Sequence, residues 1–360
     1  MTEPIRIALV GAGTFGRKHL AVLEAEPGFA PAGIADPSPA ARALAEEHGL
    51  PWHEDAGALL DAVRPDGAIV VTPNPLHVPH GLLCIERRVP VLVEKPVAET
   101  PEGGEQLAAA SERVGVPVLV GHHRRHNPIL ETAREIVGSG RLGRVVAANL
   151  TWLTRKPDGY FDVAWRREPG GGPVLINLVH EIDALRFVLG EIVAVRAMTA
   201  NAARGFPVED TAAVLLCFAS GALGTVVLSD AAETPWNWEL TSGENPIYPR
   251  QPAGCGVIAG TQGSLSLPDL DVWCHADRPG TERGWAVPML RERVPFTPDD
   301  AYRRQLRHFG RVIRREEMPR VGARDATRTL AVCLAIPEAA RTGREVVLNG
   351  PARVMEGVGR

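Results

Sequence analysis

The first 123 residues alternate short apolar segments with helical ones, and this alternation constrains the fold more than any other feature of the sequence. Strands that are apolar almost throughout, each followed by a helix, are typical of a parallel sheet buried on both faces. The pattern therefore predicts a doubly wound α/β domain. Its predicted strands are residues 5–11, 31–36, 67–73, 89–96 and 116–123, and its clearest helices are residues 14–26, 39–48 and 102–114.

A glycine-rich turn joins the first predicted strand to the first predicted helix. In the segment GAGTFG, Gly11, Gly13 and Gly16 have the spacing of a dinucleotide-binding turn, and Thr14 and Phe15 complete it. The three glycines would allow the tight turn, the approach of a pyrophosphate to the backbone, and close helix–strand packing. The free N–H groups and dipole of the helix N-terminus favour phosphates. A tight turn without a ligand is the simpler alternative, but this context favours a Rossmann nucleotide site.

An acidic residue at the end of the second predicted strand indicates which dinucleotide binds. Asp36 lies twenty residues after Gly16, where a carboxylate can accept hydrogen bonds from both ribose hydroxyls of NAD. The same charge would repel the 2′-phosphate of NADP. Arg42, on the following helix, is the counterargument, because its side chain could swing toward a phosphate. The sequence therefore predicts NAD rather than NADP.

After residue 125 the strands become longer and few helices separate them, which predicts a second α/β domain with a large, mostly antiparallel open sheet. A hairpin is expected at Ala219–Ser220–Gly221 and a turn at Gly263. Residues 234–256 are expected to form a loop. The predicted domains are residues 1–123 and 124–360, with the last helices able to pack back on the first domain. The predicted strands are residues 145–154, 193–200, 211–230 and 257–268, and the predicted helices are residues 175–190, 299–315 and 324–341.

Composition and charge exclude several classes of partner. The chain has 360 residues, 45% of them hydrophobic and 23% charged, as expected for a soluble globular protein. Its formal net charge of −4 and dispersed basic residues argue against nucleic acid or an anionic membrane surface as a partner. No apolar stretch is long enough to span a bilayer, and no signal peptide is recognised. The five cysteines are widely spaced, so we expect reduced thiols in a cytoplasmic protein.

Four motifs in order along the chain resemble those of the Gfo/Idh/MocA family of oxidoreductases. They are GAGTFG at 11–16, TPNPLH at 72–77, EKP at 94–96 and GGGPVLINLVHEID at 170–183. The resemblance spans nearly the whole chain. It implies a Rossmann domain followed by an α/β domain whose open sheet often forms the interface of a homodimer or homotetramer.

The same resemblance implies roles for individual residues. Lys95 of the EKP motif would reach the oxygen of the reacting carbon near the nicotinamide, and His180 matches the catalytic histidine. Either His123 or Arg124 is a candidate substrate contact. Apart from the resemblance, Tyr160 lies in a predicted loop just before Trp165, where it could orient a substrate hydroxyl or be an ordinary loop aromatic. The residues implied to border the cofactor are Thr72, Pro73, Asn74, His77, Glu94, Lys95, Trp165 and Arg166.

The sequence departs from the family pattern beside the histidine. Many polyol dehydrogenases of the family have aspartate four residues before it, but here that position is Ile176 and the next is Asn177. Residues three and four positions before His180 on a helix both lie next to it. Asn177 could therefore hydrogen-bond the substrate or the histidine, but it cannot act as a carboxylate base.

These residues support hydride transfer between a nicotinamide and a secondary alcohol of a sugar, sugar derivative or cyclitol. His180 is a natural general base, because its ordinary pKa of about 6.5 suits proton transfer near neutral pH. Lys95 would stabilise alkoxide character, or would itself accept the proton if burial lowered its pKa. A ketone or imine reductase, a dihydrodiol dehydrogenase and a non-catalytic cofactor-binding regulator remain as alternatives.

Two further groups of residues are interpreted as structural. Adjacent histidines at His122, His123 and His126 need not converge, and no cysteine or carboxylate pattern accompanies them, so we predict no metal site. Tyr302 and His308 lie on a predicted helix and are expected to pack in the protein interior.

Overall fold

The computed structural model describes residues 3–276 and 284–348, which form two compact units. The first unit comprises Met1–His126 and Asp299–Ala331, and the second comprises Asn127–Pro298 and Val332–Arg360. The chain therefore returns to the first unit after it has built most of the second.

The first unit contains a six-stranded sheet in the order β3-β2-β1-β4-β5-β6, and every neighbouring pair is parallel. This is the strand order of a Rossmann domain, with the point of reversal between β1 and β4. The strands are β1 (Ile5–Val10), β2 (Phe29–Ala35), β3 (Trp52–His53), β4 (Gly67–Val70), β5 (Val91–Val93) and β6 (Val118–Val120). The predicted parallel sheet is confirmed.

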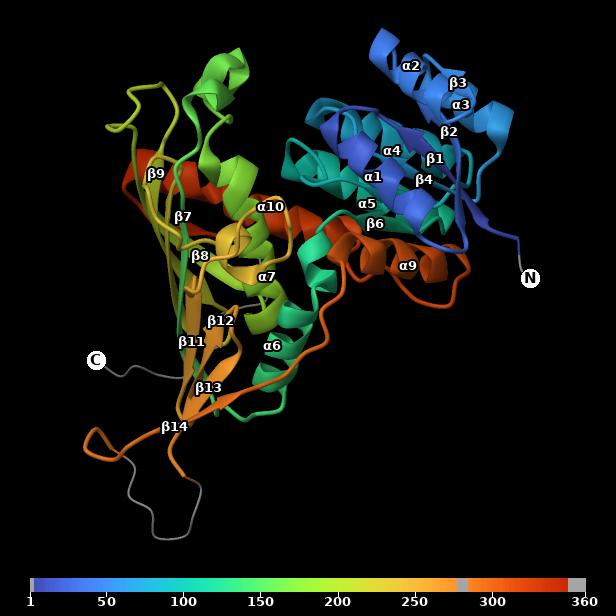
Figure 1. Cartoon of the computed structure of the whole chain (residues 1–360). Helices are drawn as coiled ribbons and strands as arrows, with labels where there is room; N and C mark the ends of the chain where they lie inside the picture. Colours follow the sequence, from blue (N-terminus) through green and yellow to red (C-terminus); the bar gives the residue numbers. More distant parts are fainter. Residues whose placement is uncertain (1–2, 277–283, 349–360) are drawn as a thin grey trace. The chain divides into compact units, whose positions relative to one another are not determined.

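Helices connect these strands and cover the sheet (Figure 1). They are α1 (Thr14–Ala25), α2 (Pro39–Glu47), α3 (Ala56–Val63), η1 (Asn74–Leu76), α4 (His77–Glu86), α5 (Pro101–Val114), η2 (His123–His126) and α9 (Ala301–Ile313). The late helix α9 shares its buried face with the sheet, since Leu306 and Phe309 pack in one apolar cluster with Ile7 and Leu9 of β1. Helix α10 (Ala323–Thr342) begins in the first unit and ends in the second.

The second unit contains a nine-stranded sheet in the order β14-β13-β12-β11-β7-β10-β9-β8-β15. All neighbouring pairs are antiparallel except β7 and β10, which run parallel. The predicted large, mostly antiparallel sheet is confirmed. Its strands are β7 (Val145–Leu153), β8 (Ile192–Ala200), β9 (Thr211–Phe218), β10 (Leu223–Ser229), β11 (Gly256–Gly260), β12 (Gly263–Leu267), β13 (Asp271–Cys274), β14 (Leu290–Arg293) and β15 (Val346–Val347).

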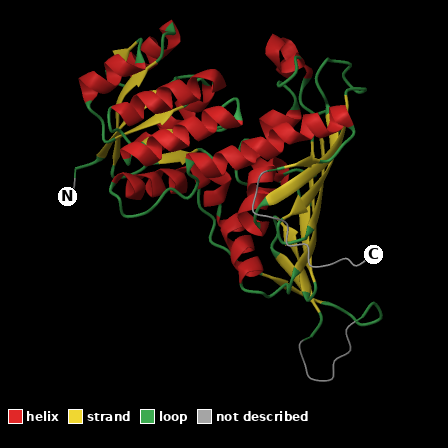
Figure 2. Cartoon of the chain, turned by 180° about the vertical axis from the view of Figure 1, so that it is seen from behind, coloured by secondary structure: helices red, strands yellow, loops and turns green. Residues whose placement is uncertain are grey.

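One face of this sheet is covered by helices, as Figure 2 shows for the strands in yellow and the helices in red. Residues of α6 (Pro128–Gly138), α7 (Val179–Leu189) and the C-terminal half of α10 share an apolar core with alternate residues of β9 and β10. The residues between them, such as Leu215 and Leu223, point away from this core and are more than half exposed, at 55% and 59%. Short helices η3 (Asp158–Asp162), η4 (Ala164–Arg167), η5 (Val174–Leu178) and α8 (Trp238–Ser242) complete the unit.

Three local predictions for the second unit differ from the structure in instructive ways. The expected loop at 234–256 contains α8, because Asn237 caps it by accepting a hydrogen bond from the Leu240 N–H (2.8 Å) and Trp238 is buried. Gly263 begins β12 rather than occupying the turn before it. The helix expected at 175–190 starts as the π-helical turn η5 and only then continues as α7.

Candidate active site

Two glycines of the turn after β1 are required because a side chain at either position would overlap neighbouring backbone. Gly11 has a φ of +100°, and a Cβ there would lie 2.7 Å from the carbonyl oxygen of Val71. A Cβ on Gly16 would lie 2.3 Å from the carbonyl oxygen of Gly11. Gly13, the N-cap of α1, is different, because no atom of the described residues beyond the adjoining backbone lies within 4 Å of the position its Cβ would take. The turn thus leaves a backbone-lined space at a helix N-terminus, which fits a dinucleotide pyrophosphate.

This contrast predicts opposite behaviour for two alanine variants. Gly16→Ala is expected to lower the stability of the first unit by about 1–3 kcal/mol, because its methyl group overlaps the Gly11 carbonyl. Gly13→Ala is expected to keep the wild-type melting temperature but to bind dinucleotide more weakly, because its methyl group enters the open space. Thermal melting and calorimetric titration with NAD on both variants check this. Equal NAD affinity for Gly13→Ala and wild type would remove the pyrophosphate from this turn.

Asp36 follows β2 and is tied to the glycine turn. Its carboxylate accepts hydrogen bonds from the backbone N–H groups of Ala12 (2.9 Å) and Ser38 (2.9 Å). Burial alone would raise the pKa of Asp36, but these bonds lower it below its usual value, so the group is ionised at neutral pH. Arg42 donates to Glu46 at 3.0 Å, in an exposed pair on α2.

His77, the first residue of α4, links the segments that follow β4 and β5. Its Nε2 lies 2.8 Å from the carbonyl oxygen of Thr72, and its Nδ1 lies 2.7 Å from that of Pro96. His77 is 1% exposed, and each of its ring nitrogens faces a backbone carbonyl. Thr72, Pro73 and Asn74 themselves lie at or near the surface between β4 and α4.

Glu94 is buried directly after β5 and fixes the backbone of Lys95. One carboxylate oxygen lies 2.8 Å from His19 Nε2, and the other accepts the Lys95 N–H at 3.0 Å. Gly121 makes room for this carboxylate, because a Cβ there would lie 2.9 Å from it. Burial opposes ionisation, but His19, Lys95 and His123 more than compensate and lower the pKa of Glu94 to about 2. Glu94 is therefore a buried anion behind the partly exposed Lys95.

An aromatic stack continues from this pair and includes two residues that the sequence did not single out as part of a site. The ring of Tyr302 on α9 stacks on His123 with centroids 4.2 Å apart and meets His19 edge-on at 5.7 Å. The Lys18 ammonium lies 3.5 Å from the centre of the same ring. His19 was missed although it lies one turn after Gly16 on α1, and Tyr302 was interpreted as ordinary packing.

The neighbouring histidines serve different partners. His126 lies beside His308, with ring centroids 5.1 Å apart, and His308 Nδ1 lies 2.7 Å from Glu317. Burial lowers the pKa of both His126 and His308. Arg124, like His123, is buried in η2. Within residues 3–276 and 284–348, no group of three or more His, Cys, Asp or Glu side chains could hold a metal ion.

The first-unit candidates share one edge of the sheet. The segments that carry Gly11, Asp36, Thr72, Lys95 and His123 directly follow β1, β2, β4, β5 and β6, and these strands are all parallel. The carboxyl ends of parallel strands form the ligand edge of a doubly wound sheet, at the point where the strand order reverses. The fold thus gathers five segments that lie far apart in the sequence.

In the second unit, the glycines that precede His180 in the sequence pack closely against neighbouring groups. A Cβ on Gly171 would lie 2.1 Å from the carbonyl oxygen of Trp165, and one on Gly172 would lie 2.2 Å from the carboxylate of Glu209. The glycine run therefore exists because the chain passes close to both groups. Asn177 lies in the π-helical turn η5 and His180 on the first turn of α7, partly exposed.

The loop after β7 brings aromatic and cationic side chains together. The Arg166 guanidinium lies 4.0 Å from the centre of the Tyr160 ring and donates to the Tyr160 carbonyl at 2.8 Å. Burial raises the pKa of the Tyr160 phenol. Trp165 is 54% exposed, and the Arg166 guanidinium lies 5.6 Å from the centre of its ring.

Lys156, Arg204 and Asp230 form a charged group in the second unit that the sequence did not indicate. The Lys156 ammonium donates to Asn177 Oδ1 at 2.8 Å and lies 3.5 Å from Asp230. Arg204 contacts the same aspartate at 3.1 Å. These residues belong to loops at the ends of β7, β8 and β10, so only strand pairing brings them together. No spacing rule within one segment would have found them.

Comparison with known proteins places these features in a class and a family. A model of the NAD-binding Rossmann fold of an oxidoreductase family matches residues 5–122, which makes the protein an oxidoreductase. A model of the GFO/IDH/MocA C-terminal domain matches residues 130–266. The two matches cover most of the chain, which therefore belongs to the Gfo/Idh/MocA family.

Several relatives share sequence or fold with this chain. Rhizopine catabolism protein MocA of Rhizobium meliloti is 30% identical over 230 residues, which cover 62% of this chain and 70% of that protein. D-xylose 1-dehydrogenase (NADP(+)) 2 of Haloferax volcanii is 28% identical to this chain. That match covers 86% of this chain and 89% of the Haloferax protein. The WlbA dehydrogenase from Bordetella pertussis, solved with NADH and UDP-GlcNAcA, has a TM-score of 0.77 at 22% identity. That match covers 97% of this chain and 100% of WlbA, and it shows a common fold.

Among residues 3–276 and 284–348, no helix combines the length and apolar character that a bilayer crossing requires.

Proposed function

We propose that this oxidoreductase is an NAD-dependent dehydrogenase that acts on a secondary alcohol of a sugar, sugar derivative or cyclitol. One observation carries the proposal. The sheet edge that bears the open glycine turn and ionised Asp36 also bears Lys95, whose backbone is anchored by the buried anion Glu94. A dinucleotide seated on that edge would bring its reactive ring to the end of β5. The sugar-related names of the relatives support the substrate class.

In the proposed reaction, Lys95 and His180 act on the same substrate oxygen. The Lys95 ammonium donates to that oxygen and stabilises negative charge as it develops. The His180 imidazole accepts the hydroxyl proton while the C–H bond breaks and the carbonyl forms. The bound nicotinamide supplies the acceptor for the hydride. Glu94 and His77 hold the backbone around Lys95, and Trp165 and Arg166 border the cofactor.

The test of the activity is formation of NADH, followed by absorbance at the nicotinamide band, with a panel of monosaccharides, sugar acids, anhydrosugars, inositols and aromatic dihydrodiols. We expect turnover within the sugar and cyclitol members of the panel. Turnover of dihydrodiols alone would replace this substrate class. Binding of NAD without turnover of any compound, in either direction, would support a cofactor-binding regulator instead.

NAD is the proposed cofactor in preference to NADP. The carboxylate of Asp36 is fixed by two backbone N–H groups and ionised, and Arg42, the cation considered from the sequence, is paired with Glu46. We expect Asp36→Ser to weaken NAD binding about tenfold and to narrow the preference over NADP, because a repulsive charge is removed. Calorimetric titration of wild type and variant with both dinucleotides measures this. Unchanged selectivity in the variant would show that another residue discriminates.

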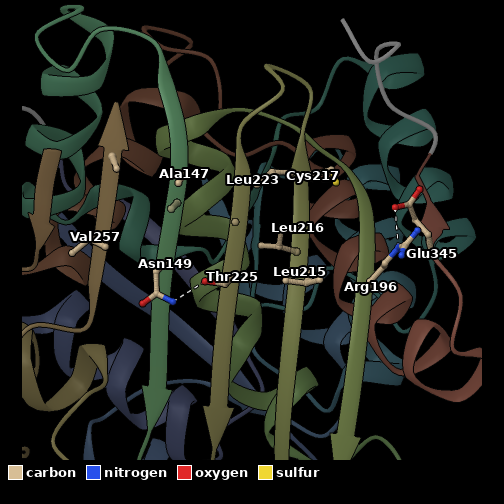
Figure 3. Close-up of a pocket in the computed structure, with 13 residues that line it drawn as sticks. Ala147, Asn149, Arg196, Leu215, Leu216, Cys217, Leu223, Thr225, Val257 and Glu345 are labelled. Carbon is tan, nitrogen blue, oxygen red and sulfur yellow. Dashed lines mark hydrogen bonds and ion pairs between the residues drawn. The ribbon is translucent and has the colours of Figure 1, made fainter. Parts of the chain in front are cut away.

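A second copy of this chain is the proposed partner of the sheet face that lies opposite the helices. Figure 3 shows this face, where a shallow depression of about 470 Å³ is lined by Leu215, Leu223 and Val257 from three strands. The pair Asn149–Thr225 (2.7 Å) lies among them, and Arg196–Glu345 (3.3 Å) borders one side. An exposed apolar area of this kind is typical of a subunit interface. Free thiols at all five cysteines agree with the proposed cytoplasmic location.

Leu215→Glu is therefore expected to turn the oligomer into a monomer, because it places a charge in the middle of the buried interface. Multi-angle light scattering after size exclusion measures the mass. Met318→Glu is the matched control, since Met318 is 84% exposed in the first unit. An unchanged mass for Leu215→Glu would mean that the sheet face does not pair.

A further inference from the structure

Two charged side chains hold the π-helical turn that leads into His180. The turn η5 contains Asn177 and runs directly into α7, whose second residue is His180. Glu209, just before β9, accepts the N–H of Val174 at 3.2 Å, where the turn begins. Lys156, just after β7, donates to Asn177 Oδ1 at 2.8 Å, near its end. Side chains from two other segments therefore hydrogen-bond to both ends of the turn.

The carboxyl group of Glu209 occupies a closely fitting space beside Gly172. Gly172 leaves the space that its Oε1 occupies, since a Cβ on that glycine would lie 2.2 Å away. Burial raises the pKa of Glu209 above its usual value, although hydrogen bonds from its own backbone and from Val174 oppose this shift. A carboxylate kept in this position satisfies a backbone N–H at the start of the turn.

Several contacts also fix the position of the Lys156 side chain. Its side chain is 11% exposed, its ammonium lies 3.5 Å from Asp230, and it faces the Tyr160 ring at 4.6 Å. Arg204 fixes the same aspartate from the other side at 3.1 Å. Burial lowers the pKa of Lys156, Asp230 raises it, and Arg204 and Arg166 lower it. A buried lysine with an aspartate on one side and an amide on the other has one defined position.

The turn that Lys156 and Glu209 contact is π-helical. A π-helical turn is rare and is frequently found at functional sites. It persists where the surroundings hold it. Here the turn ends two residues before the histidine proposed to take the substrate proton, so the contacts that hold the turn affect the position of the imidazole.

We infer that Lys156 and Glu209 are positioning residues for His180, which hold the turn at Val174–Leu178 so that the imidazole is presented in one orientation. The inference rests on the proposed function, in which His180 exchanges a proton with the substrate alcohol. Lys156 acts through Asn177, which thereby has a role that requires no carboxylate at the position of Ile176.

The first test needs no substrate. Hydrogen–deuterium exchange of the segment Val174–His180 is measured in the full-length protein for Lys156→Met and Glu209→Ala. We expect exchange to accelerate about fivefold to tenfold, the equivalent of losing one hydrogen bond. Glu209→Gln keeps an acceptor oxygen for the Val174 N–H and is expected to stay close to wild type. Arg155→Met and Glu233→Gln remove exposed charges of the same sign from the second unit and are the controls.

The second test separates positioning from substrate contact. On the true substrate, Lys156→Met and Glu209→Ala are each expected to lower kcat about tenfold to a hundredfold, with little change in KM or NAD affinity. In a double-mutant cycle, Lys156→Met combined with Asn177→Leu is expected to lose no more than the worse single variant. Glu209→Gln should restore most of the activity that Glu209→Ala loses.

The outcomes are distinguishable. Unchanged exchange in both Lys156→Met and Glu209→Ala would overturn the inference whatever the activity is. Additive losses in the cycle, or a loss confined to substrate KM, would make Lys156 a substrate contact rather than a positioning residue. Absence of turnover by the wild-type protein on every substrate would defeat the proposed function, while the exchange measurement would still report on the turn.

Discussion

Lys95→Met is expected to lower kcat by roughly a hundredfold to a thousandfold and to leave the Kd for NAD within about threefold of the wild-type value. Methionine keeps the length and apolar stem of the side chain but removes the donor that meets the developing alkoxide. The anchor of the backbone is retained, since Glu94 accepts a hydrogen bond from the backbone N–H of residue 95, which methionine also has. The loss should therefore fall on the chemical step.

Pre-steady-state kinetics and calorimetric titration with NAD make the measurement. His180→Asn, tested beside it, is expected to lose a comparable factor, because the proton acceptor is removed. Arg113→Met, which removes an exposed cation from α5, is the control and should behave as wild type. Near-normal kcat in Lys95→Met would remove the lysine from the reaction. A large loss of NAD affinity would make it a cofactor contact instead.

Periodicity and turn chemistry were enough to predict the parallel sheet of the first unit from the sequence. A parallel sheet requires apolar strands separated by helices, and the strand must end at Gly11 because its φ of +100° is incompatible with extended pairing. Asp36 was placed by the same logic, since it is the first polar residue after β2. These features are local, so a single stretch of sequence contains all the information that determines them.

The second unit was predicted less completely, because its architecture depends on long-range pairing. The hairpin of β9 and β10 was evident from its turn, but nothing local indicates that β10 also pairs parallel to β7. That pairing brings Lys156 next to Asp230, two residues that lie in separate segments. Glu209 was missed for a similar reason, because its relevance depends on the packing of Gly172 against it.

The buried part of the first-unit site shows the same limit. Tyr302 comes from α9, which the chain forms only after most of the second unit, and yet it stacks on His123. An aromatic residue on an amphipathic helix is ordinarily part of the core, and the sequence offered no reason to read it otherwise. His19 did carry a signal, because it follows the glycine turn by one helical turn and faces the sheet.

Glu94→Gln is expected to lower the free energy of unfolding by about 3 kcal/mol at pH 7, because it leaves His19 beside an uncharged partner in the interior. The pKa of Glu94 is lowered from 4.5 to about 2 in the folded protein. A carboxyl group with a lowered pKa stabilises the fold fully above its unfolded pKa, and this stabilisation is lost as the pH falls toward the folded value. The gap between wild type and variant should therefore narrow by about 1 kcal/mol at pH 4.

Urea unfolding at pH 7 and pH 4 checks both parts of this expectation. Glu24→Gln is the matched control, since Glu24 also pairs with a histidine, His48, at 2.6 Å, but at the surface. An exposed pair of this kind contributes less than about 1 kcal/mol, so the control should change stability little at either pH. If Glu94→Gln lost no more than Glu24→Gln, the Glu94 carboxylate would not be the buried charge that anchors Lys95. A gap independent of pH would mean that packing, and not ionisation, is what the glutamine disturbs.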